Sequence, residues 1–264
     1  MSNIWGAPAR PSAPSRRAFL PSPVFLLIVA VFAASGTALW IGQAAKFAVF
    51  GFVLSGWLMS LCLHEYAHAL VAYLGGDHTV AEKGYLTLDP LKYSNPLLSF
   101  GIPLVFVLLG GIGLPGGAVL IEHHRLRGRA WESAVSAAGP MVNVLFAVVS
   151  VTGVGAAASA GLGHPDFWAG LAFLSFLQVT AAILNLLPVP GLDGFGIIQP
   201  WLPRSALEAA AKVARFGVLI VFFVLLWIPQ VNAVFFRVVF TIVSALGGDP
   251  GLAMQGYGLF RFWT

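Results

Sequence analysis

Long apolar stretches run through this chain and constrain its fold more than any other feature. Segments long enough to cross a lipid bilayer lie near residues 24–42, 47–74, 133–153, 167–187 and 214–229, with a weaker one at 232–246. Hydrophobic residues make up 58% of the chain and charged residues only 9%, which lies outside the range of ordinary soluble domains. The sequence therefore predicts an all-α polytopic membrane protein with about six transmembrane helices.

The basic residues give the chain a formal net charge of +4, but they are scattered through short loops. Scattered loop cations are typical of the charge bias that orients membrane proteins, whereas nucleic-acid binding needs a basic patch. We therefore expect the chain to contact the lipid bilayer and no nucleic acid. The single cysteine, Cys62, excludes an internal disulfide framework, and we expect it to be a buried, inert thiol.

Residues 1–23 form a separate segment that is rich in Pro, Ser and Ala and carries Arg16 and Arg17 just before the first apolar stretch. This composition predicts a disordered cytosolic tail, followed by a transmembrane domain at 24–246 and a C-terminal tail at 247–264. A cleaved signal peptide is the alternative, but the first apolar stretch is long enough to span and lacks a clear cleavage site. We expect a protein of the bacterial inner membrane with a cytosolic N-terminus.

The second apolar stretch contains the motif His64-Glu65-Tyr66-Ala67-His68. Positions four apart lie on one face of a helix, so both imidazoles can reach one metal ion while Glu65 projects beside them. A charge at the centre of a membrane-spanning helix costs roughly 2.5–3.5 kcal/mol on insertion scales, so such residues are rarely present without a task. The motif predicts a catalytic zinc ion, with Glu65 as the general base that takes a proton from water.

A catalytic zinc site needs a third protein ligand on the same side of the membrane. The stretch 167–187 ends in a segment rich in Pro and Gly that contains Asp193. If residues 97–121 do not cross the membrane, this segment returns to the cytosolic half, where His64 is expected. Taken alone, Asp193 is equally compatible with a plain cytosolic turn. Glu122 and Glu132 are the alternative third ligands, as in a zinc protease of the prenyl-protein type.

Residues 97–121 are apolar but carry basic residues on both sides, Lys92 before them and Arg125, Arg127 and Arg129 after them. A run of Gly and Pro at 110–117 also interrupts any helix in the second half. Both facts favour a re-entrant hairpin that returns to the cytosol. The preceding stretch, Gly75 to Pro96, has an alternating run near Tyr85 and predicts a short β segment at the membrane surface.

The chain resembles the site-2 protease family of intramembrane zinc metalloproteases. Four motifs between residues 47 and 200 carry this resemblance, in the order of the family: His64-Glu65-x-x-His68, Gly84 to Pro90, Ala138-Gly139-Pro140-x-x-Asn143, and Asn185-x-x-Pro188 leading into Leu192-Asp193-Gly194. The resemblance implies that His64, His68 and Asp193 bind one Zn²⁺ per chain and that Glu65 is catalytic. It also places Asn143 near the active site, where its amide would hold the substrate backbone or the oxyanion. As a bare residue, Asn143 could equally form a hydrogen bond between helices.

Two positions depart from the family pattern, Gly191 in place of a second proline and Phe195 in place of a small residue, and both concern substrate access near Asp193. The sequence also predicts a minimal member, without an inserted peptide-binding domain or a nucleotide-sensing domain. The expected function is hydrolysis of peptide bonds in or near the transmembrane segments of other membrane proteins, with the active site in the cytosolic half. The alternative is a non-proteolytic membrane transporter or scaffold that binds metal.

Overall fold

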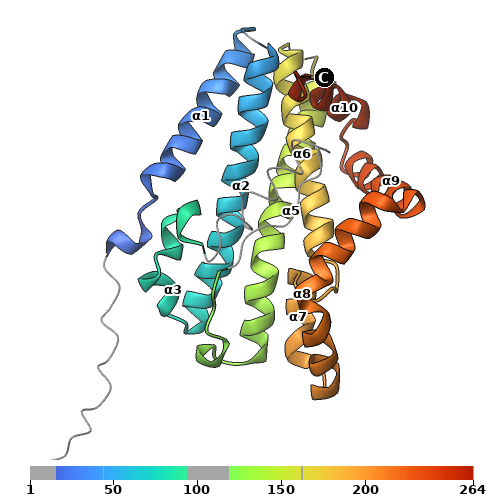
Figure 1. The fold of residues 1–264 in the computed structure, drawn as a ribbon. Coiled ribbons are helices and arrows are strands. Elements are labelled where there is room, and N and C mark those ends of the chain that lie inside the picture. Colours follow the sequence, from blue (N-terminus) through green and yellow to red (C-terminus); the bar gives the residue numbers. More distant parts are fainter. Residues whose placement is uncertain (1–15, 44, 94–118, 162, 264) are drawn as a thin grey trace, which may run out of the picture.

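The structure is a computed structural model that describes residues 16–43, 45–93, 119–161 and 163–263 (Figure 1). Within these ranges the secondary structure is helical. The longer helices are α1 (Pro23–Trp40), α2 (Ala45–Gly75), α5 (Arg129–Ser159), α6 (Pro165–Asn185), α8 (Arg204–Trp227), α9 (Pro229–Ala245) and α10 (Pro250–Phe260). The shorter elements are η1 (Arg16–Phe19), α3 (Thr79–Glu82), η2 (Tyr85–Thr87), η3 (Pro90–Lys92), η5 (His123–Arg125), α7 (Asp193–Ile198) and η6 (Gln199–Trp201).

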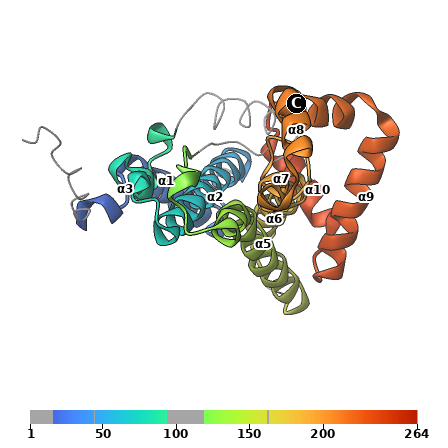
Figure 2. The same ribbon diagram turned by 90° about the horizontal axis from the view of Figure 1, so that it is seen from below.

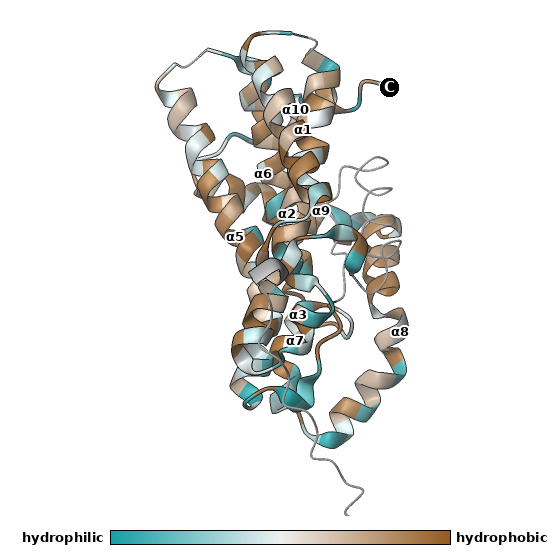
Figure 3. Ribbon diagram, turned by 90° about the vertical axis from the view of Figure 1, so that its left-hand side faces the viewer, coloured by the Kyte–Doolittle hydropathy of each residue, from teal (hydrophilic) through white to brown (hydrophobic). Residues whose placement is uncertain are grey.

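Among the described residues, four helices, α1, α2, α5 and α6, are each long and apolar enough to cross a membrane, and the number rises to six if the bent α8 and the bent pair α9–α10 each count as one span. Figure 3 shows hydrophobic residues along these helices and hydrophilic residues gathered around α3, α7 and the nearby start of α8. The prediction of an all-helical, multi-pass membrane protein is confirmed.

Helices α2, α5 and α6 form the centre of the molecule, with α1 packed against α2 and α10 packed against α6 (Figure 1). In the most apolar window of each helix, 61% of α2 and 78% of α6 is buried, compared with 17% of α1 and 33% of α5. The core between them includes Val49 and Phe52 of α2 and Phe173 and Leu177 of α6. Helices α8 and α9 extend to one side of this bundle (Figure 2). The central position of α2 buries His64, Glu65 and His68 of its histidine motif.

The β segment expected near Tyr85 is absent from the described part of the chain between Gly75 and Tyr93. In its place is the 3-10 turn η2, which lies between two residues in the left-handed region, Gly84 at φ 77° and Leu88 at φ 56°. Extended backbone cannot pass through these two positions, so the alternating pattern does not form a strand. The prediction of a surface β segment is therefore wrong, although Tyr85 is buried as a strand residue would have been.

The predicted re-entrant hairpin falls largely outside the described residues, and it stays a prediction. The segments on either side of it meet at one end of the bundle. Asp77, just after α2, accepts a hydrogen bond of 2.8 Å from the backbone amide of Glu122, and the amide of Arg127 donates to the carbonyl of Gly75 over 3.0 Å. Helix α5 therefore starts at the end of the molecule where α2 stops.

The last helix, α10, lies within residues 247–264, the stretch that the sequence predicts to be a C-terminal tail. Its first residue, Pro250, follows Asp249, whose side chain accepts a hydrogen bond of 2.7 Å from the amide of Gly251 and so caps the helix. Gly256 faces the carbonyl of Ala169 on α6 so closely that any side chain at this position would clash with it. Helix α10 thus packs directly on the backbone of α6.

Candidate metal centre

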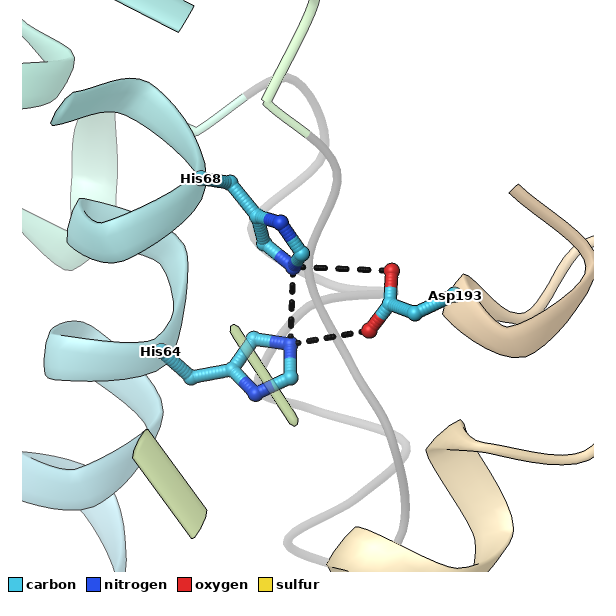
Figure 4. A group of neighbouring side chains, drawn as sticks. All are labelled: His64, His68 and Asp193. Carbon is cyan, nitrogen blue, oxygen red and sulfur yellow. Dashed lines mark hydrogen bonds and ion pairs between the residues drawn. The ribbon is translucent and has the colours of Figure 1, made fainter. Parts of the chain in front are cut away.

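Two histidines from α2 and one aspartate from α7 converge in the interior of the bundle (Figure 4). Nε2 of His64 lies 3.0 Å from Nε2 of His68 and 3.2 Å from Oδ2 of Asp193. Nε2 of His68 lies 3.5 Å from Oδ1 of Asp193. Among the described residues, this is the one group of three such side chains whose ligand atoms all lie within 4.8 Å of one another.

These distances fit zinc. Two ligand atoms that each lie about 2.0–2.2 Å from a tetrahedral zinc ion are separated by about 3.3–3.6 Å. Of the three separations in the site, 3.5 Å lies within this range, and 3.0 and 3.2 Å lie only slightly below it. Three protein ligands leave one tetrahedral position for water or substrate, as in catalytic zinc sites and unlike closed structural sites.

Both imidazoles are oriented by hydrogen bonds at the nitrogen that faces away from the site. Nδ1 of His64 lies 2.6 Å from Oδ1 of Asn143, and Nδ1 of His68 lies 2.7 Å from the carbonyl oxygen of Val135. Oxygen atoms at these places accept a hydrogen bond from Nδ1–H, which leaves the lone pair of Nε2 directed towards Asp193. Both neutral histidines are therefore prepared to bind a metal.

Asp193 reaches the site because the chain turns sharply after α6. Gly191 has a φ of 101°, a conformation that residues with a side chain rarely adopt. Gly194 lies against the carbonyl of Leu186 with no room for a Cβ atom. An ionised carboxylate is the form that binds zinc.

Glu65 lies beside the two histidines on α2 and is only 2% exposed. The backbone amide of Val119 donates a hydrogen bond to its carboxyl group. The second oxygen, Oε2, is buried and has no hydrogen-bond partner among the described residues. A buried oxygen without a partner is costly, and such atoms often have a catalytic role. This oxygen is available to accept a proton from water.

Glycine at position 139 makes room for the metal. A Cβ atom built there would clash with Nε2 of His68 and would lie 2.5 Å from Nε2 of His64. At Gly139, α5 therefore lies close to the Nε2 atoms of His64 and His68. Even the smallest side chain at this position would occupy the space that a metal ion needs. The lack of space beside the two histidines explains why the Ala138-Gly139-Pro140 motif has glycine at its centre.

The alternative third ligands lie elsewhere. Glu122 forms an ion pair of 3.3 Å with Lys83 and one with Arg125, and Glu132 lies 3.6 Å from His123. These contacts hold Glu122 at the start of η5 and Glu132 in the first turn of α5. The structure thus brings Asp193, and neither glutamate, to the histidines.

Asn143 lies behind the site, between helices. Its oxygen faces His64, and its Nδ2 donates to Oε1 of Gln178 on α6 over 2.8 Å. Both ends of the amide are thus engaged in hydrogen bonds between helices, and contact with substrate stays a prediction. Gln178 was missed by the sequence analysis, although a glutamine in the middle of a spanning segment is a signal of a buried polar contact.

A buried group of two histidines and one carboxylate, beside a second carboxylate with one oxygen that has no partner among the described residues, defines a metal-dependent hydrolase. Its position within a bundle of membrane-spanning helices makes this a membrane-embedded enzyme.

Comparison with known proteins agrees with this class. A protein of Mycolicibacterium smegmatis named "Putative zinc metalloprotease Rip2" is 46% identical over 256 residues, which cover 95% of this chain and 97% of the relative. A protein of Mycobacterium tuberculosis with the same name is 44% identical over 257 residues, or 94% of this chain and 96% of the relative. "Putative zinc metalloprotease YwhC" of Bacillus subtilis is 33% identical over 187 residues, which cover 65% of this chain and 78% of the relative. No family model and no solved structure matches. The chain belongs to this family of zinc metalloproteases, the site-2 protease family that its motifs resemble.

Proposed function

We propose that this protein is an intramembrane zinc protease that hydrolyses peptide bonds in or near the transmembrane segments of other membrane proteins. The observation that carries the proposal is the grouping of His64, His68 and Asp193 at zinc-ligand distances inside a bundle of apolar helices. Its partners are membrane-protein substrates that share its bilayer, and not nucleic acid. The relatives named as zinc metalloproteases favour this function over a transporter or a structural metal protein.

In the proposed reaction, a water molecule attacks the carbonyl carbon of the scissile peptide. Zinc, when bound by His64, His68 and Asp193, supplies Lewis-acid activation of the water and the carbonyl. Oε2 of Glu65 accepts the proton that the water loses as the new C–O bond forms. The C–N bond then breaks, and Glu65 returns the proton to the nitrogen of the leaving amine. Glu65 is thus restored at the end of each turnover.

The depth of the site has a consequence for the substrate. His64 lies 11 residues before Gly75, the last residue of α2, which corresponds to about 16 Å of helix. The peptide bonds of a transmembrane helix at that depth have their carbonyls engaged in internal hydrogen bonds. We infer that a substrate helix must unwind locally before the water can attack, so segments with helix-breaking residues are the favoured substrates.

We propose that the protein resides in a bacterial inner membrane with its N-terminus in the cytosol. Arg16 and Arg17 precede α1, and the end of α2 lies near Lys83 and Arg125, which agrees with the bias of basic residues towards the cytosol. This orientation puts the metal centre in the cytosolic half of the membrane. The source organisms of the named relatives are all bacteria.

The test is a comparison of membrane proteomes from cells that carry either the wild-type protein or the Glu65→Gln variant. We expect membrane-protein fragments cut within or next to a spanning segment in wild-type cells only. One such substrate, purified and mixed with the purified enzyme in detergent, should be cleaved in the same place. Identical proteomes together with zinc that stays bound in Glu65→Gln would favour a structural metal protein.

A further inference from the structure

We propose that Gln178 is a positioning residue of the metal centre: through Asn143, it fixes the tautomer in which His64 presents its lone pair to zinc. This inference rests on the proposed role of His64 as a zinc ligand. Gln178 lies on α6, a helix that supplies none of the three metal-binding side chains, and it is fully buried.

Four hydrogen bonds lead from His64 through three helices and back to α2. The first two join Nδ1 of His64 to Oδ1 of Asn143 at 2.6 Å and Nδ2 of Asn143 to Oε1 of Gln178 at 2.8 Å. In the third, Nε2 of Gln178 donates to Oγ of Ser60 over 2.8 Å. In the fourth, the Ser60 hydroxyl donates to the carbonyl of Trp57 over 2.9 Å. No residue from His64 to Ser60 along this path is more than 4% exposed, so water cannot replace a missing partner.

The direction of these hydrogen bonds is set at the end farthest from the metal. The carbonyl of Trp57 can only accept, so the single hydroxyl hydrogen of Ser60 points to it. Ser60 must then accept from the amide nitrogen of Gln178, and the oxygen of Gln178 therefore faces Asn143. That oxygen needs a donor, so Asn143 turns its nitrogen to Gln178 and its oxygen to His64.

The last step concerns the imidazole. Because the oxygen of Asn143 can only accept, His64 carries its proton on Nδ1, and Nε2 keeps the lone pair that zinc requires. If the amide of Asn143 flipped, its nitrogen would donate to Nδ1 and the proton would lie on Nε2, where it excludes a metal. His68 has no such alternative, because its partner is the backbone carbonyl of Val135. Gln178 is the group that prevents the flip.

The first test measures zinc affinity in the purified full-length protein by competition with a chelator of known affinity. The Gln178→Leu variant should bind zinc about 10- to 100-fold more weakly, the range expected when a partner behind a metal ligand is lost. The matched control is Thr180→Val on the same helix, since Thr180 is equally buried and donates only to the carbonyl of Leu177. We expect the control to keep its zinc affinity, and unchanged affinity in Gln178→Leu would overturn the proposal.

Two further variants separate positioning from packing. Gln178→Glu keeps an oxygen that demands a donor from Asn143, so it should keep most of the zinc affinity even if Gln178→Leu folds poorly. Asn143→Asp presents oxygen to His64 in either orientation, so adding Gln178→Leu to it should cause almost no further loss. An equal loss from Gln178→Leu in both backgrounds would mean that Gln178 acts through packing and would overturn the proposal.

The His64→Ala variant tests the metal site separately from the positioning role of Gln178. If His64→Ala loses zinc while Gln178→Leu keeps it, the metal site stands and the positioning role of Gln178 is wrong. If His64→Ala keeps full zinc affinity, the metal site itself is wrong, and the role of Gln178 falls with it.

Discussion

At the scale of single residues, Glu65 offers the most direct separation of chemistry from metal binding. The Glu65→Gln change keeps the shape of the side chain but removes the basic oxygen that accepts a proton. We expect cleavage to fall by at least about 100-fold, the lower range for loss of a general base, with bound zinc unchanged. Substrate cleavage and metal content are measured on the same preparation. Glu122→Gln, in the surface ion pairs with Lys83 and Arg125, is the control.

A change at Asp193 should weaken zinc binding itself, unlike the change at Glu65, because the structure places the Asp193 carboxylate at ligand distance from both histidines. Asp193→Asn replaces a charged oxygen ligand with a neutral one. Zinc affinity should fall about 10- to 100-fold or more, and cleavage should be lost with it. Titration with limiting zinc measures the change. A full metal complement under those conditions would remove Asp193 from the site.

Gly139 supplies a steric test that leaves every ligand in place. In Gly139→Ala, the added methyl group would occupy the space in front of the two Nε2 atoms, so zinc binding should be lost while the helices stay folded. Gly153→Ala is the matched control, because a Cβ atom at this position of α5 has nothing within 4 Å. Helical content by circular dichroism and zinc content together decide the outcome. Equal zinc content in the two variants would contradict the steric role.

At the scale of secondary-structure elements, apolar length and histidine spacing allowed much to be predicted. The stretches 47–74 and 167–187 correspond closely to α2 and α6, since a span of the hydrocarbon core requires about 20 apolar residues. The four-residue spacing alone puts His64 and His68 on one face. The partners of Asn143 could not be predicted, because they depend on how α2, α5 and α6 are rotated about their axes. The prediction of a strand near Tyr85 was wrong because the two flanking residues, Gly84 and Leu88, have left-handed backbone conformations.

Helix α10 is too short to be recognised as a span, and its attachment to α6 depends on one close approach. Gly256→Ala should push α10 away from the carbonyl of Ala169 and lower stability by about 1–3 kcal/mol, the usual cost of overpacking. Gly258→Ala, two residues on in the same helix and with open space at its Cβ position, should have no such effect. Thermal unfolding of both variants is the measurement. Equal melting temperatures would show that α10 does not depend on this contact.

At the scale of the whole molecule, the contact between Asp193 and His64 requires that the segment between α2 and α5 begin and end on the same side of the membrane. We expect single cysteines at Lys92 and His124, each in a Cys62→Ala background, to be labelled by a membrane-impermeant reagent from the cytosolic face only. The reason is that Asp77 and Glu122 join the segments before and after residues 94–118 at one end of the bundle. Labelling from opposite faces would mean that the segment between them crosses the membrane.

The metal site draws its ligands from two distant parts of the chain, the histidines from α2 and the aspartate from the turn after α6. A bound ion therefore closes a long loop of the chain, and it stabilises only the folded form. At a free zinc concentration 100 times the dissociation constant, that linkage contributes about 2.7 kcal/mol. A cell starved of zinc would then hold a less stable copy of this protein as well as an inactive one. Quality-control proteases would degrade it faster, so the abundance of the enzyme would follow the zinc supply of the cell.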